Sequence, residues 1–215
     1  MDRMLSLQGF LRRLLNGRRG WPACAGLFTL LWVLVPGAQA HVEAGGAGSV
    51  MAGFLHPVTG LDHVVAMVAV GLWGAVLGAP AIWLLPVAFP MVMAFGALLG
   101  LLQLPLPGVE LGIALSALVL GVLVMLQQRL PMAVAAIVVG VFALFHGYAH
   151  GVELPDGADA LLFSLAFVVA TGLLHLVGIL LGEIRRWAWG PRVLQCTGAG
   201  IAVVGVWSLI QVGGA

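Results

Sequence analysis

The chain contains no lysine and carries few charges of either sign. Its nine basic residues are all arginines, eight residues are acidic, and charged residues make up 8% of the 215. Hydrophobic residues make up 62%, and the mean hydropathy is +1.14. This composition is too apolar for a soluble globular domain, and it leaves no basic surface for nucleic acid. We therefore expect an integral membrane protein whose surroundings are the lipid bilayer.

Thiols are scarce, and a nucleotide-binding loop is absent. The two cysteines are Cys24 and Cys196, and the first falls in the leader described below, so cysteine usage indicates no redox compartment. A Walker A loop requires a lysine, and the chain has none. The 31 glycines are therefore typical of membrane helices and do not indicate a phosphate-binding loop.

Residues 1–40 read as a signal peptide. Five arginines form a basic leader, and the apolar run from Ala23 to Val35 is too short to span a bilayer comfortably. A proline and a glycine break that run, and residues 38–40 (Ala-Gln-Ala) form a small-x-small cleavage site. We expect cleavage after Ala40, which leaves residues 41–215 as a single transmembrane domain. An uncleaved first span is the alternative.

Apolar segments recur from residue 50 onward, separated by short connections rich in proline and glycine. A transmembrane helix needs ~20 residues. The expected spans are approximately 50–78, 81–104, 109–128, 131–151, 159–182 and 193–213. The expected fold class is therefore an all-α integral membrane protein with about six transmembrane helices after a cleaved signal peptide.

Small residues four apart indicate where these helices approach one another closely. The pairs are Gly74/Gly78, Gly96/Gly100 and Gly147/Gly151. The last pair is interleaved with two histidines, so the helix that carries them is expected to lie tight against its neighbours.

Beyond the leader, arginines occur only in the connections after the third and fifth spans, at Arg129, Arg185, Arg186 and Arg192. The positive-inside rule places both connections in the cytoplasm. A cleaved signal peptide independently places residue 41 outside, and six alternating spans then give the same orientation. We expect a multi-pass protein of the bacterial cytoplasmic (inner) membrane with its mature N-terminus outside.

The fourth span ends in a polar cluster at residues 145–153, Phe-His-Gly-Tyr-Ala-His-Gly-Val-Glu. If the helix continues through it, His146 and His150 are four residues apart and Glu153 follows on the same face. Neighbouring imidazoles at that spacing can bind one cation. The alternative is a helix end whose polar residues meet the lipid headgroups, but an ionisable cluster at membrane depth is by default a functional hypothesis.

A second cluster, His56, Asp62 and His63, lies near the start of the first span, and the orientation above puts both clusters at the outer face. In a straight helix His56 and His63 would lie about two turns, or ~10 Å, apart. Pro57 and Gly60 offer a break, which is tolerated at membrane depth where the backbone lines a cavity. The alternatives are an interfacial cap at His56 and a mutually satisfied Asp62–His63 pair.

Imidazoles and carboxylates without thiolates suit a first-row divalent ion such as nickel, cobalt, zinc or copper. The expected ligands of one metal site are His56, Asp62, His63, His146, His150 and Glu153. Two weaker candidates are Met67, one turn beyond His63, and His175 in the fifth span. Methionine in a span usually packs, and a lone intramembrane histidine often forms an interhelical hydrogen bond.

His41 is a further weak candidate. Cleavage after Ala40 would give His41 a free α-amino group, which together with its imidazole can chelate a divalent ion. The glycine-rich residues 45–48 would tether this chelate close to the first span and raise its effective concentration there. The alternative is a terminus without a role.

These motifs resemble those of the HupE/UreJ family of bacterial nickel permeases. The resemblance is carried by His-x5-Asp-His at 56–63 and by Phe-His-Gly-x-Ala-His-Gly-x-Glu at 145–153, and it extends to the leader, the span count and Leu174-His175. The first motif is also similar to the shorter signature of the larger nickel-cobalt transporter family. The resemblance implies secondary transport of nickel, or of cobalt, into the cytoplasm, for hydrogenase or urease maturation. It implies no tightly bound cofactor beyond the transported ion.

Two other functions also use histidine and carboxylate groups in a membrane. An intramembrane metal-dependent hydrolase would hold zinc with an open position for water and use Glu153 as the base, but the external loops are very short. A bis-histidine haem anchor would lack nearby carboxylates, and Asp62 and Glu153 argue against it. We expect a transporter and not an enzyme. Without a Walker A loop, its driving force would be an ion gradient, the membrane potential or the gradient of the substrate.

Overall fold

The computed structural model of the protein describes residues 46–155 and 157–214. Throughout these residues the regular structure is helical, which confirms the all-α fold class. The helices are α3 (Gly46–Thr59), α4 (Leu61–Leu77), α5 (Ala81–Leu101), α6 (Val109–Met125), α7 (Met132–Val152), α8 (Ala160–Glu183), η1 (Ile184–Arg186) and α9 (Gly190–Gly213). The predicted signal peptide, its cleavage site and His41 lie outside the described residues.

Each of the six predicted spans corresponds to helix in the structure. Among the described residues, α5, α7, α8 and α9 are each long and apolar enough to cross a membrane. The pair α3 and α4 passes the same test as one span bent by 79°. The remaining apolar helix, α6, has 17 residues, slightly fewer than a full crossing needs. By length and composition the chain is a multi-pass membrane protein with four to five such spans.

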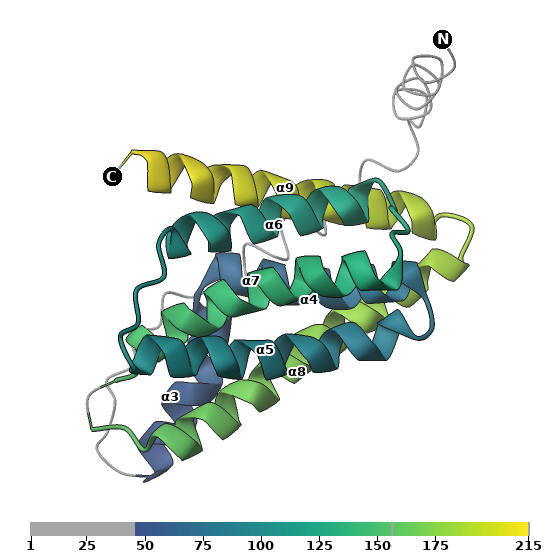
Figure 1. The fold of residues 1–215 in the computed structure, drawn as a ribbon. Helices are drawn as coiled ribbons and strands as arrows, with labels where there is room; N and C mark the ends of the chain where they lie inside the picture. Colours follow the sequence, from purple (N-terminus) through teal and green to yellow (C-terminus); the bar gives the residue numbers. More distant parts are fainter. Residues whose placement is uncertain (1–45, 156, 215) are drawn as a thin grey trace.

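Helix α4 occupies the centre of the bundle (Figure 1). Every residue from Val65 to Val76 is buried, because α4 packs against α3, α5, α6, α8 and α9. A helix that is apolar on all sides is stable only when other helices enclose it. By contrast, α5 exposes Trp83, Val87 and Met91 on its outer face, as expected for a surface in contact with lipid.

Helices α5 and α7 make the closest pair, and glycines make this possible. A Cβ on Gly147 or Gly151 would collide with the backbone of α5, and one on Gly96 or Gly100 would collide with the backbone of α7. The predicted small-residue contacts are thus confirmed for these two pairs. The prediction is wrong for Gly78, which has open space around its missing Cβ and ends α4 with φ +82°.

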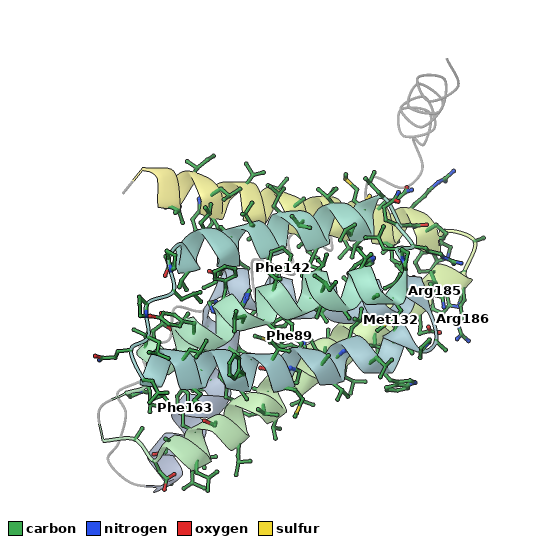
Figure 2. The ribbon with its side chains drawn as sticks, in the orientation of Figure 1. Phe89, Met132, Phe142, Phe163, Arg185 and Arg186 are labelled. Carbon is green, nitrogen blue, oxygen red and sulfur yellow. The ribbon has the colours of Figure 1, made fainter. Side chains whose placement is uncertain are left out.

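The two arginine-bearing connections lie at the same end of the bundle, as predicted. The side chain of Gln127, after α6, donates a hydrogen bond of 2.8 Å to the carbonyl of Pro191, after η1. Figure 2 shows Arg185, Arg186 and Met132 together at this end and Phe163 at the opposite end. We call these ends the arginine end and the histidine end, because the predicted ligands at positions 56 and 150 contact Phe163 and its neighbour Phe167.

Candidate metal site

The site begins with the break between α3 and α4. Gly60 stands between the two helices in an extended conformation (φ −89°, ψ 116°), and the chain bends there by 79°. The break therefore falls at Gly60, whereas Pro57 lies within α3. The bend removes the two-turn separation that a straight helix would impose, so His56 at the end of α3 and His63 at the start of α4 both face the end of α7.

Glycine at position 60 also leaves room for the polar pair that follows. A Cβ built on Gly60 would stand 3.0 Å from both Asp62 Oδ1 and His63 Nδ1. Any other residue would therefore press on this pair. The sequence indicated a break at this position, and the structure shows that the same glycine also shapes the site.

The most exposed part of the site joins α3 to the end of α7. His56 Nε2 lies 3.2 Å from Glu153 Oε2, a distance suited to a hydrogen bond that the ring donates to the carboxylate. One ligand atom from each of His56, His150 and Glu153 lies within 4.8 Å of the others. Three donors this close together can bind one metal ion with little rearrangement.

The histidine rings continue from this group toward the interior. The His56 and His150 ring centroids are 4.9 Å apart, those of His150 and His63 are 4.7 Å apart, and those of His63 and His146 are 5.0 Å apart. The four imidazoles thus form one connected row.

The two ends of this row differ in exposure, because its outer end is open to solvent and its inner end is buried. The Glu153 side chain is 51% exposed, that of His56 is 26% exposed and that of His63 is 13% exposed. His150 and His146 are 5% and 0% exposed. The row therefore leads from solvent at the histidine end into the bundle.

Two hydrogen bonds fix which ring nitrogen can bind a metal. His63 Nδ1 lies 2.9 Å from Asp62 Oδ1, and His146 Nδ1 lies 2.9 Å from the carbonyl oxygen of Phe142. Because a carbonyl or an ionised carboxylate only accepts, each Nδ1 carries the proton and each Nε2 presents a lone pair. This is the usual way that proteins orient a metal-binding histidine.

The Nε2 atoms of His63 and His146, oriented in this way, have no partner among the described residues. Both ring nitrogens of His150 also lack one, and all four atoms are buried. Leaving one buried polar group without a hydrogen bond costs about 1–3 kcal/mol. A cluster of four such atoms is therefore a feature that a bound ligand would stabilise.

The charge at the mouth of the site is negative. The hydrogen bond from His56 holds the pKa of the Glu153 carboxyl below its usual value. Glu153 is therefore ionised at neutral pH and attracts cations toward the exposed end of the row.

The structure brings most of the predicted ligands together and separates others. His56, His63, His146, His150 and Glu153 form the row and its mouth, whereas Asp62 is engaged by His63 and orients that ring. Met67 is fully buried among apolar residues of the core. His175 lies on α8, where its ring contacts Phe89, 5.2 Å between centroids.

Sequence reasoning missed the aromatic wall of the site. Phe163 and Phe167 of α8 contact His56, at 5.7 and 6.2 Å between ring centroids, and Phe167 lies 4.2 Å from the ring of His150. Phe89 of α5 contacts His146 at 5.8 Å. The four-residue spacing of Phe163 and Phe167, continued by Thr171 and His175, is the signal that would have pointed to one face of α8.

Comparison with known proteins agrees with these motifs. The family model described as HupE / UreJ protein matches residues 29–208. Protein HupE of Rhizobium leguminosarum bv. viciae is 45% identical over 173 residues, which cover 80% of this chain and 90% of that protein. No solved structure matches the chain significantly. With the family model covering most of its length, the chain belongs to the HupE/UreJ family.

Proposed function

We propose that this protein is a secondary transporter that carries nickel, with cobalt as a second cargo, from the outer side of the membrane into the cytoplasm. The observation that carries the proposal is the group of four buried imidazole nitrogens that find no partner within residues 46–155 and 157–214. They lie in a row that opens to solvent at a carboxylate. Such a row offers a divalent ion successive ligands between water and the membrane interior.

The donor set supports this class of cargo. Imidazole and carboxylate groups without thiolate favour borderline first-row divalent ions over calcium or cuprous ions. The HupE/UreJ family is associated with nickel and cobalt transport. A role in supplying hydrogenase or urease maturation follows from that family membership as part of the proposal.

The direction of transport rests on the charge distribution. The arginine end carries Arg129, Arg185, Arg186 and Arg192, and the positive-inside rule favours the cytoplasm for this end. The histidine end then faces outward in the bacterial inner membrane. An arriving ion would meet Glu153 and His56 first, and then His150, His63 and His146 in turn.

The driving force is a gradient, since the sequence has no nucleotide-binding loop. No tightly bound cofactor takes part, and the metal ion is the substrate. The protein would then act as a permease and not as an enzyme. Ligand number and geometry along the row, and not residue spacing, would set the preference for nickel over cobalt or zinc.

Uptake of radiolabelled nickel by cells that express the full chain tests the proposal, with cobalt, zinc and copper as competitors. We expect uptake in the wild type, competition by cobalt, and loss of uptake in His63→Ala and His150→Ala at unchanged membrane expression. Thr197→Val, which changes a buried hydroxyl on α9 that donates to Val193, is the matched control. Wild-type uptake in both histidine variants would contradict the transporter proposal. Hydrolytic activity of the protein without any nickel uptake would favour a metal-dependent hydrolase.

A further inference from the structure

One face of α8 extends below the histidine row toward the arginine end. Phe163, Phe167, Thr171 and His175 follow one another every four residues on this face, and all four are buried. The first two contact the row at His56 and His150. Thr171 and His175 stand one and two turns beyond Phe167, about 6 and 12 Å deeper along the helix axis.

The two deeper side chains are polar, buried and without hydrogen-bond partners among the described residues. Thr171 is 0% exposed and His175 is 1% exposed. The Thr171 hydroxyl and both His175 ring nitrogens form no hydrogen bond. Other buried hydroxyls of the bundle do form one, since Thr197 and Ser116 each donate to a carbonyl of their own helix. The lack of a bond at Thr171 is therefore not a general property of these helices.

Helix α5 presents a third polar group at the same place. The carbonyl oxygen of Pro86 approaches the His175 imidazole, although the pair does not reach the geometry of a hydrogen bond. In a regular helix that carbonyl would accept from the N–H of residue 90, but residue 90 is a proline and has none. Backbone carbonyls that lack a helical hydrogen bond coordinate ions in membrane transporters whose helices are broken.

Phe89 separates this group from the histidine row. Its ring centroid lies 5.8 Å from that of His146, the innermost histidine of the row, and 5.2 Å from that of His175. Both contacts are edge-on, with interplanar angles of 63° and 83°. Phe89 itself is fully buried, so its ring stands between the two sets of nitrogens.

We propose that His175, the Thr171 hydroxyl and the Pro86 carbonyl form a second, inner binding site for a divalent metal ion, and that the Phe89 ring gates passage to it from the histidine row. This inference rests on the proposed transport function. The inner site offers one imidazole and two neutral oxygens, fewer nitrogen donors than the row, so it holds the ion less tightly. Weak binding at an inner site favours release, which conduction through successive sites requires.

Transport kinetics of the full chain in proteoliposomes test the inner site, with nickel outside and a nickel-quenched fluorophore inside. In His175→Gln the uptake rate at saturating nickel should fall by at least about tenfold, as expected for a lost metal-binding group. The apparent KM should not rise, because capture at the histidine row is intact. Thr171→Val should lower the same rate by a smaller factor, and Thr197→Val should match the wild type. Wild-type saturation rates in both His175→Gln and Thr171→Val would overturn the inner site.

Phe89→Leu tests the gate, with Phe95→Leu as its control, because Phe95 is 57% exposed on the same helix. We expect the saturation rate to change by more than about threefold in Phe89→Leu, since a barrier of changed height alters the rate exponentially. An unchanged rate in this variant would overturn the gate.

Binding of Co²⁺, followed by its visible absorption in nanodiscs, separates folding from function. Wild type should bind in two classes, His175→Gln should lose the weaker class, and His63→Ala should lose the tighter class. The retained tight class shows that His175→Gln is folded. Identical titrations of wild type and His175→Gln would contradict the inner site. If instead the wild type does not transport nickel, or His63→Ala transports like the wild type, the transporter proposal itself fails.

Discussion

At the scale of single residues, the two carboxylates near the histidines have different roles. Glu153 is half exposed and lies within ligand distance of His56 and His150. Asp62 accepts from both the backbone N–H and the ring of His63. Glu153 therefore belongs to the mouth of the site, and Asp62 fixes the tautomer of His63.

Asp62→Asn is therefore expected to weaken metal binding without removing a ligand. The amide keeps the size of the carboxylate but not its charge, and it can turn a donor toward His63 Nδ1, so the proton on that nitrogen is held less strongly. Loss of such an orienting partner costs roughly 10–100-fold in metal affinity. The apparent KM for nickel uptake should rise by that factor at unchanged expression. Asp159→Asn is the control, because asparagine caps α8 as well as aspartate does. Equal KM values in the two variants would show that Asp62 has no orienting role.

Uptake is also expected to fall as the outer solution becomes mildly acidic. Imidazoles bind metal only in their neutral form, so protons of an acidic outer solution compete with the metal for these rings. The pKa of Glu153 is lowered by the hydrogen bond from His56, so this carboxylate stays ionised to a lower pH than a free glutamate. Loss of uptake in mild acid therefore arises from the histidines. Initial uptake rates between neutral and mildly acidic pH measure this, and a flat profile would count against histidine ligation.

At the scale of helices, the sequence predicted where most helices begin and end, but it predicted the angles between them less well. Hydropathy places the ends of α5, α7, α8 and α9 within three residues of the predicted spans, because apolar length is a property of the chain alone. The 79° bend at Gly60 was anticipated only as a break. Its angle depends on α3 packing against α8, where Gly53 touches the backbone of Phe163, and no pattern within the first span encodes that contact.

The residues of the candidate site likewise differ in whether the sequence alone could predict their roles. His146, His150 and Glu153 could be assigned to one face from their spacing, since one helix carries them. The Asp62–His63 pair, adjacent on α4, was one of the alternatives that the sequence offered. The aromatic wall of Phe89 and Phe167 required distances between helices. Spacing along the chain therefore predicts which residues can be ligands, and the packing of the bundle decides what each of them does.

Close contact between α5 and α7 is expected to hold the histidine row in place. In Gly147→Ala the new methyl group would collide with the carbonyl of Met93. The helices must then separate, which typically costs about 1–3 kcal/mol for an overpacked interior. We expect a lower thermal unfolding midpoint and reduced uptake. Gly140→Ala is the matched control on the same helix, because no atom of the other described helices lies within 4 Å of its added Cβ. Equal stability of the two variants would show that the glycine contact does not support the site.

At the scale of the whole molecule, the two ends of the bundle differ in chemistry. The histidine end carries the carboxylate mouth of the site, and the arginine end carries basic side chains beside two exposed tryptophans. Trp187 and Trp189 are 58% and 50% exposed and contact each other at 5.0 Å between ring centroids. Tryptophans at this position are typical of the membrane–water interface. The asymmetry gives the bundle two distinct ends, as the proposed import of metal ions requires.

The orientation of the bundle in the membrane can be measured with reporter fusions. A reporter active only outside the cell, fused within residues 156–158, should be active, and the same reporter fused within residues 187–189 should be inactive. The expected physical cause is the retention of arginine-rich connections in the cytoplasm.

Replacing Arg185, Arg186 and Arg192 together by alanine should then reduce the difference between the two fusions, because only Arg129 would remain to bias that side. Replacing Gln127 by alanine, which removes a hydrogen bond to Pro191 but no charge, is the control and should leave the difference intact. The opposite reporter pattern in the wild type would mean that the histidine end faces the cytoplasm. An ion would then enter the row from the inside of the cell, which would contradict import.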